Sequence, residues 1–231
     1  MDRERLTGGV NNLERIGAVV HRPAGAWTPA VHGLLSWVRE HGFTGAPTVH
    51  GFDDDGREML DFIPGEVPPS DFRATVPALR ATGALLRSFH DATVGFTSAG
   101  PWYWPPRAPA EVICHGDIAP YNTVFRGRMP VAFIDFDTAQ PGPRVWDVAY
   151  AAYRFVPLEP GFDPARLDAF LDGYGMGFPD LFSTAAERLE ALVKHILSEA
   201  AAGHPAFARH VADGHVQIYQ RAIEFLRTFD T

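Results

Sequence analysis

The chain has 231 residues, of which 46% are hydrophobic and 21% charged, and its formal net charge is −8. This length and apolar fraction suit one large domain or two small lobes around a real core, and they exclude a disordered chain. The negative charge argues against a nucleic-acid partner, and because the sequence has neither a signal-peptide stretch nor an apolar run of roughly 18 residues, we expect a cytoplasmic protein with no membrane partner.

The first sixty residues predict short strands around one helix. Apolar residues at helical spacing follow Thr28-Pro29, which resembles an N-cap followed by proline in the first turn. Four consecutive turn residues, Asp53 to Gly56, separate two segments rich in strand-forming residues. We therefore expect a hairpin over residues 13–22, a helix from Thr28 to Gly42 and strands over residues 48–52 and 58–62.

A proline-rich break from Ile63 to Pro69 marks the expected lobe boundary, which divides the chain into residues 1–65 and 66–231. Beyond it the pattern predicts a helix that ends near His90, strands within residues 113–136, and a mainly helical remainder. The sequence thus predicts an α+β fold with a small β-rich N-lobe and a larger, mainly helical C-lobe. The expected helices of the remainder are 146–155, 165–174, 183–202 and 207–229.

The clearest chemical signal lies in residues 114–137. Asn122 follows Asp117 by five positions, which is the spacing found in a kinase catalytic loop. Pro120 prevents a regular helix there, and we expect a short hairpin to bring Asp135 back beside Asn122. Either aspartate alone would be an ordinary turn or strand-end residue, but together they place one carboxylate near an attacking hydroxyl and an Asn–Asp pair around a cation. Such hard oxygen ligands suit Mg²⁺.

With His115-Gly116-Asp117 and Phe133-Ile134-Asp135-Phe136-Asp137, the sequence resembles the aminoglycoside phosphotransferase and choline kinase superfamily, the small-molecule relatives of protein kinases. The resemblance is most specific over residues 115–149. It implies a bilobal protein-kinase-like fold that holds ATP or GTP between its lobes. It also implies roles for individual residues: Asp117 as catalytic base, His115 as the residue that orients the loop, Asn122 and Asp135 as magnesium ligands, Asp147 as a brace from a helix, and Asp137 as a less expected metal ligand.

The nucleotide side matches this family less well. Relatives present a lysine from the small lobe, paired with a helix glutamate, whereas the only lysine here is Lys194. Arg22, on a predicted strand, is the expected substitute, and a surface strand residue is the alternative. The helix glutamate is also missing, because His32 stands at mid-helix, and an Arg22–His32 pair cannot replace an ion pair. The resemblance further implies that backbone groups from Asp61 to Ile63 bind the adenine and that a loop at residues 7–12 covers the phosphates.

The acceptor side is less defined. Only eleven residues separate Asp135 from Asp147, too few for a phosphorylated activation segment, so we expect a small hydroxylated substrate rather than a protein. From Pro157 onward the chain has eleven acidic and six basic residues, which favours a cationic acceptor if those acids line its site. The alternative is that they are solvated helix faces, and nearby aromatic residues either stack on a substrate or pack between the lobes. The candidate acids are Asp168, Asp172, Glu187 and Glu190; the candidate aromatic residues are Trp102, Tyr103 and Trp104.

Together these features predict an enzyme, a magnesium-dependent phosphotransferase. It would move the γ-phosphate of ATP or GTP to a hydroxyl of a small molecule, either aminoglycoside-like or an amino alcohol. The alternative is a kinase-like protein that binds nucleotide or ligand with weak or no catalysis, which the missing lysine and glutamate favour and the intact Asp117, Asn122 and Asp135 oppose. A zinc site is not expected, because Cys114 is the single cysteine and the sequence contains no His-Glu-x-x-His motif.

Overall fold

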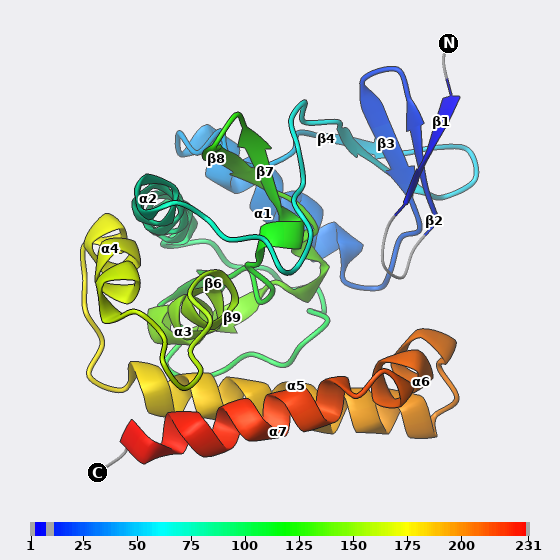
Figure 1. The fold of residues 1–231 in the computed structure, drawn as a ribbon. Coiled ribbons are helices and arrows are strands. Elements are labelled where there is room, and N and C mark those ends of the chain that lie inside the picture. The colour runs from blue at the N-terminus through cyan, green and yellow to red at the C-terminus, as the bar shows by residue number, and fades with distance from the viewer. Residues whose placement is uncertain (1–2, 8–11, 230–231) are drawn as a thin grey trace.

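The computed structural model describes residues 3–7 and 12–229. Its N-terminal part is an antiparallel sheet in the order β1-β2-β3-β5-β4, and α1 connects β3 to β4 (Figure 1). The predicted hairpin and the two later strands are present, whereas most of the loop over residues 7–12 lies outside the described residues. The bounds are β1 Arg3–Thr7, β2 Asn12–Ile16, β3 Val19–Arg22, α1 Thr28–Glu40, β4 Val49–Phe52 and β5 Glu58–Asp61.

Helix α1 buries the apolar face that the sequence predicts, but it begins differently. The N-cap is Trp27, and Thr28 is already helical; the Thr28 hydroxyl accepts a hydrogen bond from the backbone N–H of Gly25 (2.9 Å). The expectation that Thr28 is the N-cap is therefore wrong by one residue, because this hydroxyl stabilises the preceding turn instead. The buried residues of the predicted face are Val31, Leu34, Leu35 and Val38.

The C-terminal part is mainly helical, with two short antiparallel strand pairs, β6–β9 and β7–β8. This arrangement confirms the predicted α+β fold with a β-rich N-lobe and a helical C-lobe. Within the described ranges, no helix combines the length and the apolar character needed to cross a membrane. The bounds are α2 Val76–Thr93, β6 Val112–Cys114, β7 Thr123–Arg126, β8 Met129–Phe133, β9 Gln140–Gly142, α3 Arg144–Phe155, α4 Pro164–Tyr174, α5 Leu181–Ala201, α6 Pro205–Ala212 and α7 His215–Leu226.

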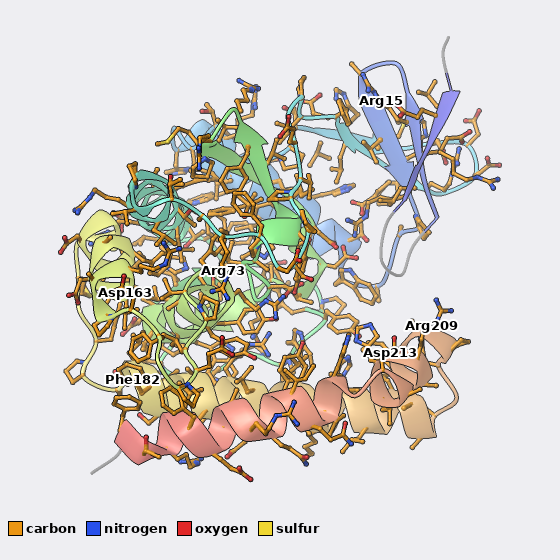
Figure 2. All side chains as sticks on the ribbon, in the orientation of Figure 1. Arg15, Arg73, Asp163, Phe182, Arg209 and Asp213 are labelled. Atoms are coloured by element: carbon orange, nitrogen blue, oxygen red, sulfur yellow. The ribbon has the colours of Figure 1, made fainter. Side chains whose placement is uncertain are left out.

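The predicted helix over residues 207–229 is two helices in the structure. Gly214 adopts a left-handed backbone conformation (φ 80°) that breaks the chain between α6 and α7. Since glycine enters this region without a steric penalty, it allows the turn. As a result α7 folds back along α5, and the two helices form the base of the molecule in Figure 1. Phe182 and Arg209 mark opposite ends of this α5–α6 layer in Figure 2.

One hydrophobic core extends from α1 to the C-terminal helices. Its largest fully buried side chains include Leu34 and Leu35 of α1 and Phe89 of α2. Helices α2 and α4 approach each other so closely that a Cβ on Gly83 would collide with the carbonyl oxygen of Phe170. The connection after β5 pairs Glu66 with Phe125 of β7. The lobe boundary at residue 65 remains a prediction.

Candidate active site

The loop that follows β6 is held from behind by Asp147, in the first turn of α3. The Asp147 carboxylate accepts hydrogen bonds from the backbone N–H groups of His115 (2.7 Å) and Gly116 (3.0 Å). Gly116 has φ 85°, and a Cβ there would collide with the carbonyl oxygen of Thr138, so only glycine fits. The brace that the sequence predicts between Asp147 and the loop is therefore present, and it fixes the backbone immediately before Asp117.

The brace itself is buried and fully hydrogen-bonded. His90 Nε2 donates to Asp147 (3.1 Å), and the other ring nitrogen of His90 lies 2.8 Å from the Tyr174 hydroxyl. Burial opposes the charge of Asp147, but the hydrogen bonds from His90 and His115 hold the pKa of this carboxyl below its usual value. Cys114 lies near His90 and Asp147, and burial raises the pKa of its thiol, which donates to the Pro143 carbonyl oxygen (3.4 Å). We read this cluster as structural support.

His115 holds the loop from inside. Its Nε2 donates to the Ile134 carbonyl oxygen (3.1 Å), and its Nδ1 accepts from the backbone N–H of Asp117 (3.3 Å). The side chain is buried, and burial lowers its pKa, which favours the neutral ring that this donor–acceptor pattern requires. His115 therefore has the geometry of a residue that orients Asp117.

Asp117 is half-buried and presents both carboxylate oxygens to neighbouring donors. One oxygen accepts from the Tyr121 hydroxyl (2.9 Å) and the other from Asn122 Nδ2 (2.8 Å). Burial raises the pKa of Asp117, whereas the Tyr121 hydrogen bond and the positive charge of Arg188 act in the opposite direction. These contacts fix the carboxylate in one orientation, as a base that must take a proton from a specific direction requires.

The expected hairpin brings Asn122 and Asp135 together. Thr123 of β7 pairs with Phe133 of β8, and the backbone N–H of Ile134 donates to the Asn122 carbonyl oxygen (2.9 Å). Asp135 adopts a left-handed conformation (φ 65°), the single such case among the described non-glycine residues. Backbone strain of this kind is of order 1–3 kcal/mol and is concentrated at functional sites. The Asp135 side chain is 48% exposed.

Arg22 reaches from β3 to the segment after β8. Its buried guanidinium contacts Glu58 (Nε to Oε1, 2.7 Å), Asp135 (Nη1 to Oδ1, 3.0 Å) and Asp137 through Nη2. Although burial disfavours the charge, the three carboxylates raise the pKa of Arg22. Arg22 is thus a buried cation that contacts three carboxylates, and the alternative of a surface strand residue is wrong.

The partner that sequence reasoning missed is Glu58. His32 does not pair with Arg22 but contacts Glu58 (Nε2 to Oε2, 2.9 Å), so β5 supplies the glutamate that the helix lacks. Arg22 and Glu58 are register partners in the β3–β5 pair. The available signal was a basic residue, Arg22, on one predicted strand and an acidic residue, Glu58, on another. The sequence did not give the strand order and register that place them opposite each other.

The oxygen donors around Arg22 are of the kind that binds a divalent cation. Asp135 and Asp137 share Arg22, so the two carboxylates already converge on one positive charge, and both are hard oxygen ligands of the kind Mg²⁺ prefers. Burial and the charge of Asp135 raise the pKa of Asp137 to about 6, although Arg22 acts in the opposite direction. The residues present therefore fit a magnesium ion held by Asn122 and Asp135, with Asp137 as a further donor.

The segment expected to bind adenine follows the end of β5. The backbone N–H of Asp61 donates to the Thr48 carbonyl oxygen (2.9 Å), and its carboxylate contacts His50 Nε2 (2.6 Å). Both the backbone N–H of Asp61 and this carboxylate oxygen therefore already have partners and are not available to an adenine base. Ile63 lies beyond the strand, and within residues 12–229 we find no backbone hydrogen bond of Ile63. Ile63 is the better candidate of the two, and the role of both remains a proposal.

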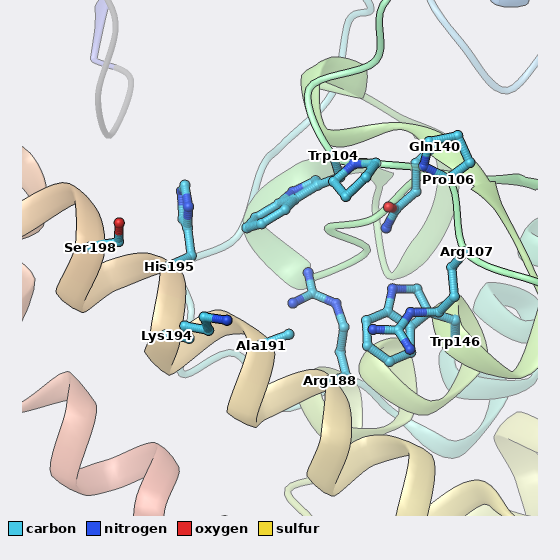
Figure 3. Close-up of a pocket in the computed structure, with 11 residues that line it drawn as sticks. Trp104, Pro106, Arg107, Gln140, Trp146, Arg188, Ala191, Lys194, His195 and Ser198 are labelled. Carbon is cyan, nitrogen blue, oxygen red and sulfur yellow. The ribbon is translucent and has the colours of Figure 1, made fainter.

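A cavity of about 520 Å³ lies between α5, the start of α3 and the segment that follows Tyr103. Its wall includes Trp104, one of the predicted aromatic residues, whereas the four predicted acids are absent from the lining. All four are exposed: Asp172 pairs with Arg80 and Glu190 with Arg227 across neighbouring helices. Of the two alternatives for these four acids, the structure agrees with solvated helix faces, because they face solvent and none of them lines this cavity. The lining residues are Trp104, Pro105, Pro106, Arg107, Gln140, Trp146, Arg188, Ala191, Lys194, His195 and Ser198 (Figure 3).

Arg188 links the cavity to the loop, and sequence reasoning missed it. This residue of α5 donates from Nη2 to the Gly116 carbonyl oxygen (2.6 Å), and its guanidinium lies over the Tyr150 ring at 4.5 Å. It is only 5% exposed. No motif marks it, since it comes from a helix more than sixty residues after the loop. A single arginine on an otherwise apolar helix face was the only available signal.

The fold and the site agree with the comparisons to known proteins. A profile of the phosphotransferase enzyme family matches residues 101–186, which include the loop with Asp117 and Asn122 as well as Asp135 and Asp147. The trifolitoxin immunity protein of Rhizobium leguminosarum bv. trifolii is 35% identical, over 78% of this chain and 78% of that protein. The chain belongs to the phosphotransferase enzyme family.

Solved structures with the same fold are more distant in sequence. A choline/ethanolamine kinase family protein from Mesorhizobium loti has a TM-score of 0.64 and 16% identity, with 99% of this chain and 93% of that chain covered. A spectinomycin phosphotransferase in complex with ADP and spectinomycin has a TM-score of 0.62 and 13% identity, with coverages of 98% and 88%. At this identity the likeness establishes the kinase-like fold.

Proposed function

We propose that the protein is a magnesium-dependent phosphotransferase that moves the γ-phosphate of ATP or GTP to a hydroxyl of a small molecule. The observation that carries this proposal is the fixed carboxylate of Asp117, which Tyr121 and Asn122 orient on a loop braced by Asp147. A buried cation, Arg22, lies across the cleft from this loop and contacts Asp135. Positioned groups of this kind are what phosphoryl transfer requires, because little covalent work falls to the protein.

The proposed step transfers one phosphoryl group directly from the nucleotide to the acceptor hydroxyl. The Asp117 carboxylate accepts the proton of the acceptor hydroxyl, and the hydroxyl oxygen forms a bond to the γ-phosphorus. The bond from the γ-phosphorus to the oxygen that bridges it to the β-phosphorus breaks, and the nucleoside diphosphate leaves with that electron pair. Asn122 and Asp135 would hold Mg²⁺, with Asp137 as a further donor; the ion supplies positive charge to the triphosphate. Ile63 and Asp61 would flank the base.

The trifolitoxin immunity protein, which is 35% identical to this chain, suggests a class of acceptor. That protein is named for immunity to trifolitoxin, so we propose toxins and antibiotics with a free hydroxyl as the first acceptors to test. Small amino alcohols and sugars complete the panel.

A second candidate function is nucleotide or ligand binding with weak or no catalysis. The observation that favours it is the Arg22 network, because the guanidinium already neutralises Asp135 and Asp137, the carboxylates that a magnesium ion would need. Under this alternative the protein binds nucleotide without transferring phosphate.

The test is transfer of labelled γ-phosphate from ATP and from GTP to the acceptor panel, with Mg²⁺ and with chelator. We expect magnesium-dependent label on an acceptor and none with Asp117→Asn. Nucleotide binding measured on the same samples separates the two candidates. Tight binding with no transfer to any acceptor, and no nucleotide hydrolysis, would support the second candidate and contradict the first.

A further inference from the structure

The cavity beside the catalytic loop is cationic in a protein that is acidic overall. Arg107, Arg188 and Lys194 line it, and Lys194 is the only lysine of the chain. Among the described residues of the lining there is no Asp or Glu, whereas the whole chain has 28 acidic and 20 basic residues. The charge of the cavity lining is therefore positive, whereas the net charge of the whole chain is −8. A cationic ligand would be repelled here.

These three cations form no ion pair with a carboxylate among the described residues, which also holds for Arg126 and Arg166, although those two donate to backbone carbonyl oxygens. On the surface, Arg57, Arg80, Arg87 and Arg227 each pair with a carboxylate within 4.0 Å. In the described part of the chain, we find no such pair for the three cations of the cavity. The Arg188 guanidinium is buried and its Nε has no hydrogen-bond partner there. Buried charges are normally paired. Arg188 lowers the pKa of Asp117 but has no carboxylate within 4.0 Å among the described residues, so an anion in the cavity would add a direct partner.

The remaining walls are aromatic and flat. Trp104 and Trp146 face the cavity, and the Arg107 guanidinium stacks 3.5 Å above the Trp146 ring (Figure 3). On the α5 side, Ala191 is small and leaves space between Arg188 and His195. His195 is held by the Tyr103 hydroxyl, 3.2 Å from its Nε2, and the nearby acid Glu199 lies outside the lining. The hollow thus combines cationic donors with ring surfaces.

The cavity adjoins the proposed reaction centre. Arg188 donates to the carbonyl oxygen of Gly116, the residue directly before Asp117, and its charge lowers the pKa of Asp117. Tyr103, next to Trp104, packs edge-on against Trp27, with ring centroids 4.7 Å apart. Arg188 thus connects a molecule in the cavity to the backbone directly before Asp117.

We propose that this cavity binds the phosphate acceptor and that the acceptor carries an anionic group, a carboxylate or a phosphate ester, next to an aromatic or other flat apolar portion. That the ligand accepts phosphate rests on the proposed function. The chemical class of the ligand rests on the cavity alone. Arg188, Arg107 and Lys194 bind the anion, and Trp104 and Trp146 contact the flat portion. The amine-bearing acceptor expected from the acidic C-terminal half does not suit this site.

The test uses three probes that differ in one group. These are 3-phenyllactate, 3-phenylpropane-1,2-diol and 1-amino-3-phenylpropan-2-ol, which carry a carboxylate, a hydroxymethyl and an aminomethyl group on the same phenyl alcohol. Binding is measured by titration calorimetry at low salt without nucleotide. We expect 3-phenyllactate to bind about 10- to 100-fold more tightly than the diol, the range for one or two charge-assisted hydrogen bonds, and the amine to bind most weakly.

Variants separate the cavity from the rest of the surface. The double variant Arg107→Gln/Lys194→Gln should lose most of the preference for the carboxylate, and Lys194→Glu should favour the amine. Arg221→Gln removes one charge from an exposed position of α7 outside the cavity and should change nothing. Since Lys194 is exposed and Arg107 half-exposed, these variants keep the fold, which circular dichroism checks. Equal affinities for the three probes, absence of binding by all three, or an unchanged double variant would overturn the proposal.

The two proposals fail in distinguishable ways. If phosphate is transferred to neutral or amine acceptors while 3-phenyllactate binds no better than the diol, the cavity assignment is wrong and the proposed function stands. If 3-phenyllactate binds through Arg107 and Lys194 while no acceptor is ever phosphorylated, the anion site stands and the phosphotransferase function is wrong.

Discussion

Two aspartates with opposite environments define the catalytic loop. Asp147 is buried but accepts two backbone hydrogen bonds, and its pKa lies below the usual value; Asp117 is less well compensated, and burial raises its pKa. The first carboxylate therefore stays ionised as a structural anchor, whereas the second is more basic and better suited to accept a proton.

Replacement of Asp117 by asparagine should lower kcat by about 10²- to 10⁴-fold, the usual contribution of a general base. Nucleotide affinity should change little, since the side chain faces the acceptor hydroxyl. Because the base form is needed and burial raises the pKa, wild-type kcat should fall as the pH drops, with a midpoint above the value of about 3.9 for a free aspartate. Steady-state kinetics between pH 4 and 8 measure both. A variant with full turnover would remove Asp117 from the mechanism.

Arg22→Met should destabilise the fold, because Glu58 would stay buried without its cation. Loss of one partner of a buried ion pair costs about 3–5 kcal/mol of unfolding free energy. Because the Asp135 side chain is 48% exposed, we expect a loss toward the lower end of this range. Urea unfolding gives the free energy. The matched control is Arg80→Met, which breaks an exposed pair with Asp172 and should cost no more than about 1 kcal/mol. Equal losses in the two variants would show that the Arg22 network contributes no more than a surface pair.

At the scale of elements, the close contact of α2 with α4 supports the rear of the site. Gly83 of α2 faces the Phe170 carbonyl oxygen, and Gly173 of α4 faces the Arg80 carbonyl oxygen, with no space for a Cβ on either. Helix α2 also carries His90, and α4 ends at Tyr174, so this contact positions the hydrogen bonds that reach Asp147. A change at the helix contact should therefore affect both stability and the loop.

Gly83→Ala tests this contact. In an open helix the change would stabilise by up to about 1 kcal/mol, but here it forces backbone apart, which costs about 1–3 kcal/mol. We expect net destabilisation and a melting temperature lower by a few degrees. Gly177→Ala is the control, because a Cβ there meets no atom within 4 Å and the backbone is not left-handed. A Gly83→Ala variant as stable as the control would mean that α2 and α4 separate without cost.

For the whole molecule, the arrangement of a sheet lobe above a helical lobe leads to a prediction about nucleotide and metal together. Arg22 comes from the sheet, and Asp135 from the C-terminal part, so a magnesium–nucleotide complex between them should contact both lobes. Binding to the native state alone stabilises it by about 2.7 kcal/mol at a ligand concentration of 100 Kd.

Thermal unfolding with ATP should therefore show a rise in melting temperature with Mg²⁺ and a smaller rise with chelator. Asp135→Asn should abolish the difference between the two conditions, since it removes a charged ligand of the ion. Asp172→Asn, on the exposed face of α4, should leave the difference intact. A magnesium effect that survives Asp135→Asn would place the ion elsewhere.

Much of this protein follows from local sequence pattern. The hairpin, the buried face of α1 and the contact between Asp117 and Asn122 depend on residues close in the chain, so spacing alone predicts them. The break at Gly214 was missed because an apolar pattern can continue across a glycine that turns the chain.

Only the tertiary structure decided which distant residues meet. Glu58 replaces the helix glutamate because strand register sets it opposite Arg22, and Arg188 reaches Gly116 from a helix whose orientation no local pattern encodes. The distribution of charge was decided in the same way: composition counts all acids, whereas packing turns the four candidate acids to solvent and places three cations around one cavity. Local structure is determined by residues that are close in the sequence, whereas long-range contacts depend on how whole helices and strands pack.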